Sequence, residues 1–403
     1  MIPVDWDVEP LGALIGSLDA GVSVRSVSDG LSSFGHDQMV LKTSCISKGR
    51  FIPAEAKVIL PADLWRAKNP AKSGSILISR MNTPDLVGEV GFVPDNWPNL
   101  FLPDRLWMML PATGRKTDMR WLTAQLAHGS PAQALRDAAT GTSGSMKNIS
   151  KPALRGVLIP SPKPTEQSAI AEALSDVDEA ITAAEAVIAK KRALKTATMQ
   201  ALLSGSRRLP GFSGEWDTEV FGQIATIRND KVQTRGLNEA RFCVELEHIQ
   251  SSSGELSGWA DAKNRTTTKY RFLLSDVLFG RLRPYLRKFW FSDRPGVCST
   301  EIWPLIPKSV EVTAAYIYQI VQTDQFLETA STAYGTHMPR ADWKFLSQSE
   351  IYLPKDTLEQ AAIAQVLTDI DLDIRNSHAK LAKIRRLKTG MMQQLLTGKT
   401  RLV

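Results

Sequence analysis

The chain has 403 residues, 43% of them hydrophobic, and a formal net charge of +7. That length is enough for two or three hydrophobic cores. Its three cysteines, Cys45, Cys243 and Cys298, are odd in number and form no CxxC pair, which favours a reducing cytoplasm over a disulfide-bonded protein. No apolar run approaches the roughly 18 residues of a membrane span, no signal peptide precedes Trp6, and the five histidines lack zinc-ligand spacing.

Residues 1–158 predict a first globular region, in which short β-type runs alternate with turn residues. In chain order we expect strands at 75–79, 86–93 and 106–110, helices at 122–127 and 132–138, a loop at 141–147 and a strand at 157–160. This mixture of short strands and helices indicates an α/β domain.

Residues 159–205 predict one long helix. Its apolar side chains recur at intervals of four and three residues, which is a heptad pattern: Ile170, Leu174, Val177, Ile181, Ala184 and Ile188. Pro164 and Thr165 mark its start, and Gly205 supplies the left-handed residue that ends it. About 38 residues rising ~1.5 Å each give a rod of roughly 57 Å.

Residues 206–349 repeat the plan of the first globular region. Strands are expected at 242–247 and 276–279, a helix at 313–328, a loop at 335–340 that corresponds to the loop at 141–147, and a strand at 351–354. This region holds the densest positive charge of the chain. Between Lys263 and Lys288 stand eight basic residues against one acid, Asp276.

Residues 350–403 predict a second long helix that copies the first. Residues 166–209 and 359–402 align without a gap at an offset of 193, with 23 of 44 pairs identical. Thr357 and Gln360 fit a capping box, and Gly398 ends the helix. An echo at an offset of 210 pairs Trp6 with Trp216. The chain is therefore a tandem duplication.

The charge along the two helices predicts how they pair. Both have an acidic first half and a basic second half, so parallel helices would place like charges together, whereas antiparallel helices would match acid with base and oppose their dipoles. We predict an α+β fold in which two α/β domains are each followed by a long helix. The helices would form an antiparallel coiled coil with pseudo-twofold symmetry, and the two globular regions would lie at opposite ends. The alternative is that each helix packs only on its own domain.

Residues 279–288 carry the most suggestive local motif. Here Arg281, Arg283 and Arg287 alternate with aromatic residues, a pattern that suits contact with bases and phosphates. The alternative is an exposed edge strand kept soluble by charge. The equivalent segment of the first half is predicted at residues 79–83. The candidate DNA contacts are Arg80, Asn82, Lys147, Lys263, Arg265, Lys269, Arg281, Arg283, Tyr285, Arg287, Lys288 and Arg340.

Signatures of catalysis are missing from the sequence. Residues 398–400 read like the end of a phosphate-binding loop, but Gln393 occupies the place of its first glycine. Residues 69–71 lack the aromatic residue of an amino-methyltransferase motif, and the triplet at 55–57 is too common to indicate a nuclease. No nucleophile-and-base arrangement stands out. We therefore predict a non-catalytic chain.

The duplicated pattern resembles the specificity subunit of type I restriction-modification systems. Each half has a globular region ending in an apolar residue and proline, then Glu-Gln, then a heptad helix ending in Met-Gln-x-Leu-Leu-[Ser/Thr]-Gly. The likeness covers the whole chain, because it includes the order of target-recognition domain (1–158), spacer helix (159–205), second domain (206–349) and second helix (350–403). The helix motif is specific to the family, whereas target domains vary.

The resemblance implies a DNA-reading subunit that holds no cofactor of its own. The spacer helices would pair and dock two methyltransferase subunits, which would carry S-adenosylmethionine and methylate adenine; restriction subunits, where present, would use ATP and Mg²⁺. The predicted contact positions on the helices are Ile170, Leu174, Ile181, Ile188, Ile363, Leu367, Ile374 and Leu381. Lys191 stands where the second helix has Ile384, so that layer is not equivalent in the two helices.

Three functions compete at this point. A DNA-specificity subunit would read two dissimilar half-sites of double-stranded DNA, separated by a gap that the helices set. A coiled-coil scaffold would bind protein partners without DNA sequence preference. An enzyme would turn over S-adenosylmethionine or ATP as the isolated chain. The resemblance favours the first.

Overall fold

The computed structural model describes residues 2–27, 37–141, 145–233, 242–262, 268–332 and 338–402. These residues form two compact units. Unit 1 comprises residues 1–183 and 381–403, and unit 2 comprises residues 184–380. Each unit therefore holds one globular region and parts of both long helices. The boundaries predicted from the sequence stay predictions, because the units divide the helices internally.

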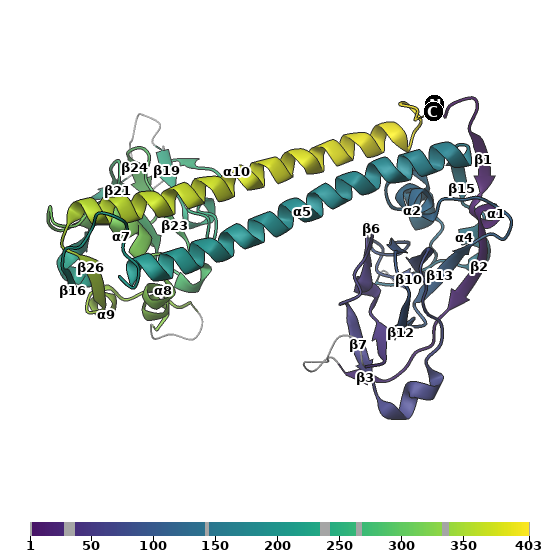
Figure 1. Ribbon diagram of the computed structural model, residues 1–403, viewed down its shortest axis with the longest axis horizontal. Coiled ribbons are helices and arrows are strands. Elements are labelled where there is room, and N and C mark those ends of the chain that lie inside the picture. The colour runs from purple at the N-terminus through teal and green to yellow at the C-terminus, as the bar shows by residue number, and fades with distance from the viewer. Residues whose placement is uncertain are drawn as a thin grey trace. The chain divides into compact units, whose positions relative to one another are not determined.

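Unit 1 is built from short strands and helices around two mixed sheets (Figure 1). Its elements are β1 Asp7–Pro10, α1 Leu11–Leu14, β2 Ile15–Ala20, β3 Ser26–Val27, β4 Met39–Leu41, β5 Ile46–Ser47, β6 Gly49–Phe51, β7 Ala56–Ile59, β8 Pro70–Ala71, β9 Ser75–Ser79, β10 Met81–Asn82, β11 Val90–Val93, β12 Trp97–Phe101, β13 Leu106–Pro111, α2 Met119–His128, α3 Ser130–Asp137, β14 Lys147–Asn148, α4 Lys151–Arg155 and β15 Leu158–Ser161, with 3₁₀ turns η1 Thr43–Cys45 and η2 Pro61–Arg66.

The two sheets of unit 1 form successive layers under the helices. The larger has the order β2-β13-β9-β11-β6-β5, and the smaller has the order β3-β7-β4-β12-β8. Strand β9 shows how the layers form, because alternate side chains of a strand face opposite sides. Ile76 and Ile78 lie in the core shared with α2, α5 and α10, whereas Leu77 lies in the core between the sheets.

Unit 2 repeats this layering. Its elements are β16 Trp216–Val220, α6 Phe221–Ile224, β17 Ala225–Ile227, β18 Lys231–Gln233, β19 Phe242–Val244, β20 Ala260–Asp261, β21 Thr268–Phe272, β22 Val277–Gly280, β23 Phe289–Phe291, β24 Gly296–Cys298, β25 Ile302–Pro307, α7 Ala314–Ile320, α8 Asp324–Ser331, α9 Trp343–Leu346 and β26 Glu350–Pro354, with η3 Leu246–His248 and η4 Pro284–Leu286.

Unit 2 also has two main sheets, with the orders β17-β25-β22-β23 and β18-β21-β24-β19-β20. In each unit the five-stranded sheet contains one parallel pair, β4 with β12 and β19 with β24. Alternation also recurs, since Val277 and Phe279 face the helix-side core while Leu278 faces the second sheet. The duplicated architecture predicted from the sequence is confirmed.

The two long helices have nearly the predicted bounds. Helix α5 spans Pro164–Leu203 and α10 spans Thr357–Leu395. Gly205 and Gly398 follow them with φ of +69° and +68°, as the predicted left-handed ends require. The predicted capping box is wrong. The carboxylate of Asp356 accepts the Leu358 amide at 2.8 Å, while the Gln360 side chain turns away to the Pro354 and Glu311 carbonyls.

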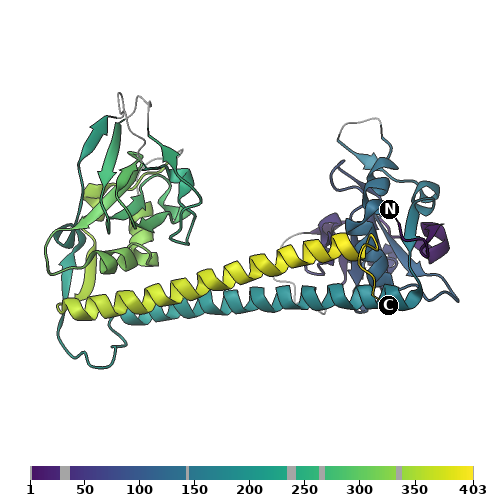
Figure 2. The ribbon, with the colours of Figure 1, turned by 90° about the horizontal axis from the view of Figure 1, so that it is seen from above.

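Segments of α5 and α10 run antiparallel within each unit. Figures 1 and 2 show them side by side, α5 in teal and α10 in yellow. In unit 1 the Lys388 ammonium lies 2.7 Å from Asp178, and in unit 2 the Lys195 ammonium lies 2.7 Å from Asp371. These pairs are equivalent at the repeat offset of 193, so an early acid meets a late base in both units. The predicted antiparallel pairing is confirmed in each.

The non-equivalent layer at Lys191 is polar in unit 2. Its ammonium reaches across to Asp373 Oδ1 at 2.8 Å and to Ser377 Oγ at 2.9 Å. A carboxylate and a hydroxyl of the facing helix thus both accept hydrogen bonds from the lysine. Hydrogen bonds to the facing helix therefore accommodate Lys191 at the position where the second helix has Ile384.

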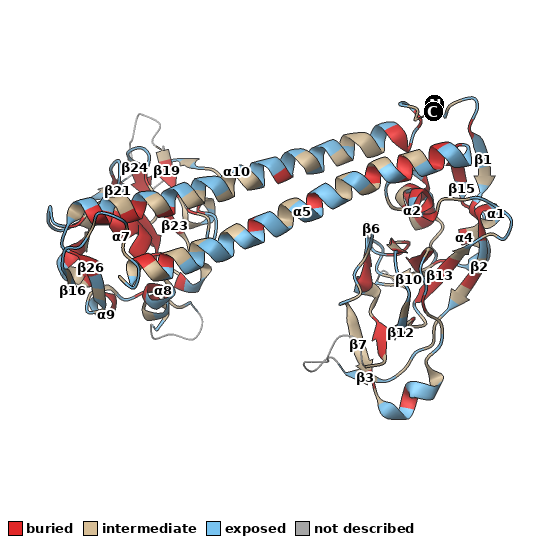
Figure 3. Ribbon diagram, viewed as in Figure 1, coloured by how far each residue is buried: buried red, intermediate tan, exposed pale blue. Residues whose placement is uncertain are grey.

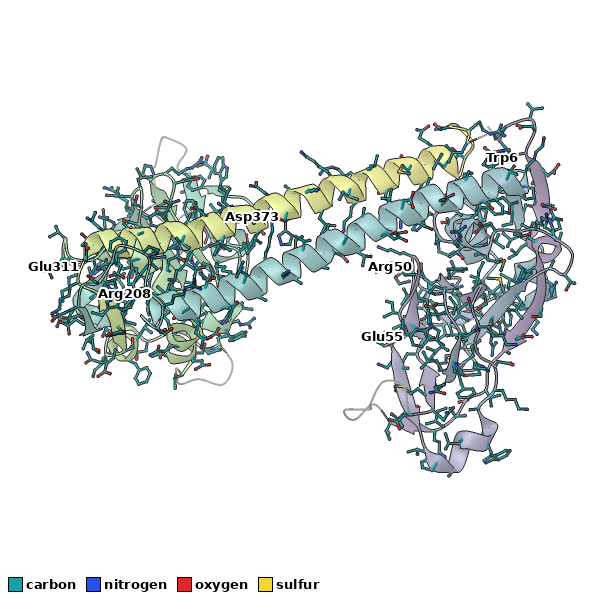
Figure 4. All side chains as sticks on the ribbon, in the orientation of Figure 1. Trp6, Arg50, Glu55, Arg208, Glu311 and Asp373 are labelled. Carbon is teal, nitrogen blue, oxygen red and sulfur yellow. The ribbon has the colours of Figure 1, made fainter. Side chains whose placement is uncertain are left out.

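A buried carboxylate closes each unit, and we call the arrangement around it the clasp. In unit 2, Glu359 accepts two hydrogen bonds from Arg208, at 2.5 and 2.6 Å, and one from the indole of Trp216 at 3.3 Å. In unit 1, Glu166 accepts the same contacts from Arg401, at 2.7 and 2.8 Å, and from Trp6 at 3.2 Å. Figure 4 labels Trp6 and Arg208 at these places. Each clasp joins the start of one helix to the segment that follows the other.

The glutamine of each Glu-Gln pair has a different structural role. Gln167 donates to the Pro162 carbonyl at 3.0 Å and accepts the Asp118 amide at 3.1 Å. Gln360 likewise accepts the Thr313 amide at 3.0 Å. The repeated motif therefore fixes each long helix to the strand before it and to the start of a short helix.

Three predicted elements differ from the observed ones, and a local hydrogen bond explains each. The strand expected at 86–93 begins only at Val90, because residues 83–89 form a turn with Gly88 at φ +83°. The strand expected at 242–247 ends at Val244, where Glu245 caps η3. The helix expected at 313–328 is two helices, because the Thr323 hydroxyl accepts the Phe326 amide and starts α8.

Burial follows the layers (Figure 3). All three cysteines are buried and none forms a disulfide bond; burial raises the pKa of the Cys45 thiol to about 12. Across the described ranges, no helix combines the length and the apolar character needed to cross a bilayer.

Candidate nucleic-acid interface

The arginine-rich segment of unit 2 is a rigid turn between β22 and β23. Arg283 and Arg287 flank η4 with φ of +52° and +53°, a left-handed conformation that side chains seldom adopt. Backbone hydrogen bonds hold both ends: the Arg283 amide donates to the Pro339 carbonyl at 2.7 Å, and the Ser252 amide donates to the Arg287 carbonyl at 2.8 Å. The turn is thus preorganised rather than shaped by a ligand.

Two side chains of this turn are open to solvent. Tyr285 at its tip is 56% exposed, and Arg283 is exposed with no ion-pair partner among the described residues. By contrast, Arg287 pairs with Asp324, and Lys288 donates to the Leu246 carbonyl at 2.7 Å. Burial lowers the pKa of the Lys288 ammonium. The donors available to a ligand here are those of Arg283 and Tyr285.

The structure brings the arginine-rich segment at residues 279–288 into contact with Arg340, the last residue of the predicted loop at 335–340. Leu282 and Arg340 form a β-bridge, and the Arg340 guanidinium binds both carboxylate oxygens of Glu301 at 2.8 to 3.1 Å. The guanidinium of Arg281 lies over the ring of Trp303, 5.2 Å from its centre. Arg281 and Arg340 therefore support the turn. Both also line one side of a cavity.

Two cavities flank the bridge between Leu282 and Arg340. One, of about 400 Å³, has an acidic lining that includes Glu245, Glu247 and Glu301. The other, of about 860 Å³, is lined by Arg281 and Arg340 together with Trp303, Trp343 and Phe345. The second combines cations and aromatic faces, the groups that contact bases and phosphates.

Unit 1 has a similar arginine–tryptophan contact at residues 79–83, the segment predicted to be equivalent to the arginine-rich turn. Arg80 lies over Trp107 at 5.6 Å, as Arg281 lies over Trp303. Strands β10 and β14 pair where unit 2 has its bridge. The predicted contacts are occupied internally, since Arg80 donates to Asn148 and to the Asp104 carbonyl, Asn82 to Ser79, and Lys147 to the Gly141 carbonyl.

Lys269 is the predicted DNA contact that the structure places least favourably. It lies on β21, is 6% exposed and pairs with Glu245 in the lining of the smaller cavity, so little of its side chain is open to solvent. Its position indicates a structural role. Lys263 and Arg265 lie outside the described residues.

The predicted contact positions on the helices are covered within the chain itself. Buried members are Ile170, Leu174, Ile181, Ile188, Ile363, Leu367 and Leu381, and Ile374 is half-buried. Ile170 and Leu174 belong to the unit 1 core, and Ile363 and Leu367 to the unit 2 core. These side chains therefore pack within the units, and a surface for another protein must use other faces of the helices.

The described residues contain no group of three or more histidine, cysteine, aspartate or glutamate side chains placed to hold a metal ion. The feature that the sequence did not reveal is an exposed tryptophan in unit 1, Trp65. Apolar residues are expected inside a fold, so only its neighbours Arg66 and Lys68 could have drawn attention to it.

The known proteins that this chain is similar to are specificity subunits of type I restriction-modification systems. Residues 247–386, which include the turn between β22 and β23, match the type I restriction modification DNA specificity domain. The specificity subunit of the type I restriction enzyme EcoDI from Escherichia coli is 23% identical over 201 residues, covering 48% of this chain and 44% of that protein. The match thus spans less than half the length of that relative.

Solved structures agree over nearly the whole chain. The S subunit of a type I restriction-modification system from M. genitalium has a TM-score of 0.61 at 15% identity, covering 98% of this chain and 96% of that one. A chain from a type I restriction-modification structure concerned with complex assembly and conformational transition has a TM-score of 0.55 at 13% identity, covering 99% and 100%. The fold is therefore that of type I specificity subunits, and residues 247–386 match the type I DNA specificity domain. The resemblance predicted from the repeated helices is confirmed.

Proposed function

We propose that the chain is the DNA-recognition subunit of a type I restriction-modification complex, and that each globular region contacts one half-site of a split target. The observation that carries the proposal is the specificity domain at residues 247–386, which contains the preorganised turn with Arg283 and Tyr285 open to solvent. The same support, an arginine stacked on a tryptophan, recurs in unit 1.

The chemistry of the turn suits a duplex. A guanidinium can bind guanine edges or phosphates, and a tyrosine ring can contact bases or sugars. A backbone already fixed by hydrogen bonds loses little entropy when it binds. Arg283 and Tyr285 are accordingly our choice for contacts of the second domain.

The partners follow from the class of subunit. Double-stranded DNA would bind the two domains, and methyltransferase subunits would bind the chain and supply S-adenosylmethionine. Restriction subunits, in a system that has them, would supply ATP-driven cleavage. The chain itself would carry no catalytic step.

The test is to co-express the chain with a candidate methyltransferase subunit and to map modified adenines across the host genome. We expect one split motif with a fixed gap. Modification at a single undivided motif would retain the recognition role and contradict the assignment of one half-site to each domain. Copurification without any modification would support a scaffold instead.

The gap between the half-sites should depend on helix length alone. Asp178 faces Lys388 and Lys195 faces Asp371, so by this register residue 183 is opposite 383 and residue 189 is opposite 377. Deleting residues 183–189 and 377–383 together removes one heptad from each helix and preserves the seam. We expect the mapped motif to keep both half-sites and to lose about 10 Å of spacing, or about three base pairs. An unchanged gap would contradict a ruler role for the helices.

A further inference from the structure

Among the described residues of unit 1, Trp65 is the most exposed large aromatic side chain. It lies on η2, in the connection between β7 and β8, and is 81% exposed. Its indole N–H donates to the Ala62 carbonyl at 3.1 Å, so the polar edge is satisfied while the ring stays in water. Neighbouring Leu64 is 39% exposed. Leu64 and Trp65 therefore place two neighbouring apolar side chains in solvent at this turn.

A buried aspartate of the same turn binds two arginines. Asp63, 3% exposed, accepts the Arg25 amide at 2.8 Å and the Arg25 guanidinium at 3.0 Å, and lies 3.4 Å from the Arg66 guanidinium. The hydrogen bonds from Arg25 lower the pKa of the Asp63 carboxyl. The side chains of Arg25 and Arg66 are nevertheless 69% and 41% exposed, and Lys68 is exposed. The turn therefore combines an exposed indole with exposed or partly exposed basic side chains, while its one acid, Asp63, is buried.

The connection between β7 and β8 has a counterpart at the same position of the sheet in unit 2. In unit 1, β7 and β8 flank the parallel pair of the smaller sheet, one on each side. In unit 2, β20 and β21 flank the corresponding pair. The chain from β7 to β8 thus corresponds to the chain from β20 to β21, which carries Lys263 and Arg265 in its sequence. Both domains place basic residues in the same connection.

We propose that residues 61–68 are a DNA contact of the first domain, in which Trp65 packs against bases or sugars in a groove while Arg25 and Arg66 bind the flanking phosphates. The inference rests on the proposed function, and it names the residues of unit 1 that would contact DNA. Apolar wedges flanked by arginine are the chemistry of groove insertion, because the ring is desolvated against bases while the cations neutralise phosphate. A protein partner is less well matched, since no exposed carboxylate of this turn balances its cations.

The test uses the full chain in complex with its methyltransferase subunit and a duplex carrying the mapped target. We expect Trp65→Ala to weaken binding about ten-fold or more, and Trp65→Phe to recover most of it. Nuclease protection should be lost over one half-site and kept over the other. The matched control is Leu158→Ala, which also removes a large exposed apolar side chain of unit 1, at 59% exposure, outside the basic turn.

Three results would overturn this inference. Equal affinity of Trp65→Ala and wild type, while Arg283→Ala weakens binding, would reject the contact and keep the proposed function. Loss of the methyltransferase from Trp65→Ala, with DNA affinity per intact complex unchanged, would assign the turn to a protein surface. A wild-type complex that binds no DNA selectively would remove the proposed function itself and this inference with it. Because Trp65 is exposed, its variants should unfold at the wild-type temperature.

Discussion

Replacing Arg208 with alanine should lower the free energy of unfolding by about 3–5 kcal/mol. The reason is the carboxylate that remains. Glu359 is fully buried and accepts two hydrogen bonds from this guanidinium, so the variant leaves a buried charge whose remaining side-chain donor among the described residues is the Trp216 indole. Chemical denaturation followed by circular dichroism measures the loss. Arg208→Lys should recover part of it, because lysine keeps the charge but not the two-pronged geometry.

The chain contains its own matched variants for this experiment. Arg401→Ala removes the equivalent guanidinium of the unit 1 clasp and should cost a similar amount. Arg294→Ala breaks an ion pair with Asp293 in which both side chains are more than half exposed, and should cost less than about 1 kcal/mol. A loss for Arg208→Ala no larger than that for Arg294→Ala would contradict a stabilising clasp.

The same clasp predicts a dependence on pH. The hydrogen bonds from Arg401 lower the pKa of the Glu166 carboxyl in the folded chain. The unfolded chain therefore binds this proton more readily, and the stabilisation is present above the unfolded pKa of about 4.3 and is lost as pH falls through the folded value. We expect the stability difference between wild type and Arg401→Ala to shrink in this acidic range. A difference that stays constant down to pH ~2 would contradict the linkage.

Lys269→Ala should destabilise unit 2 by about 3–5 kcal/mol without changing the salt dependence of DNA binding. Lys269 is buried against Glu245, so truncating it removes a counter-ion from the interior rather than a phosphate contact. Arg283→Ala should do the reverse, because its side chain is exposed. We expect unchanged stability and a reduction of about 1 in the slope of log K against log salt if Arg283 binds one phosphate.

Both variants are measured by denaturation and by titrating labelled duplex at several salt concentrations. Lys308→Ala, which removes an exposed lysine of unit 2 from outside the turn, is the control for a general change in charge. A lower salt slope for Lys269→Ala at wild-type stability would show that the lysine reaches DNA after all, and would overturn its structural assignment.

The repeated helices could be predicted from the sequence because their signals are local. Heptad spacing, a proline at one end and glycine at the other each act within a few residues, and α5 starts at Pro164 as expected. The antiparallel direction could also be predicted, because the change from acidic to basic residues can be read along each helix separately. The capping box was wrong because Gln360 has partners in a distant turn that its sequence neighbours do not indicate.

The candidate site was predictable only in part, for a related reason. Counting basic residues placed Lys269 with Arg283, yet one is buried and the other exposed, a difference that strand pairing decides. The same count could not separate Arg80, whose donors are used internally, from a free contact. Trp65 escaped notice because an apolar side chain is normally assigned to the core.

The discontinuity of unit 1 has a consequence for synthesis on the ribosome. Unit 2 is one uninterrupted stretch, residues 184–380, so all its contacts exist before translation reaches Leu381. Unit 1 begins first but needs residues 381–403, including the guanidinium of Arg401. The region made earliest would therefore be completed only after unit 2, exposing its apolar helix-facing surface until residues 381–403 emerge. Ribosome-bound chains that carry residues 1–380, followed by an unstructured linker long enough to clear the exit tunnel, would then show a protease-resistant second unit and a protease-sensitive first.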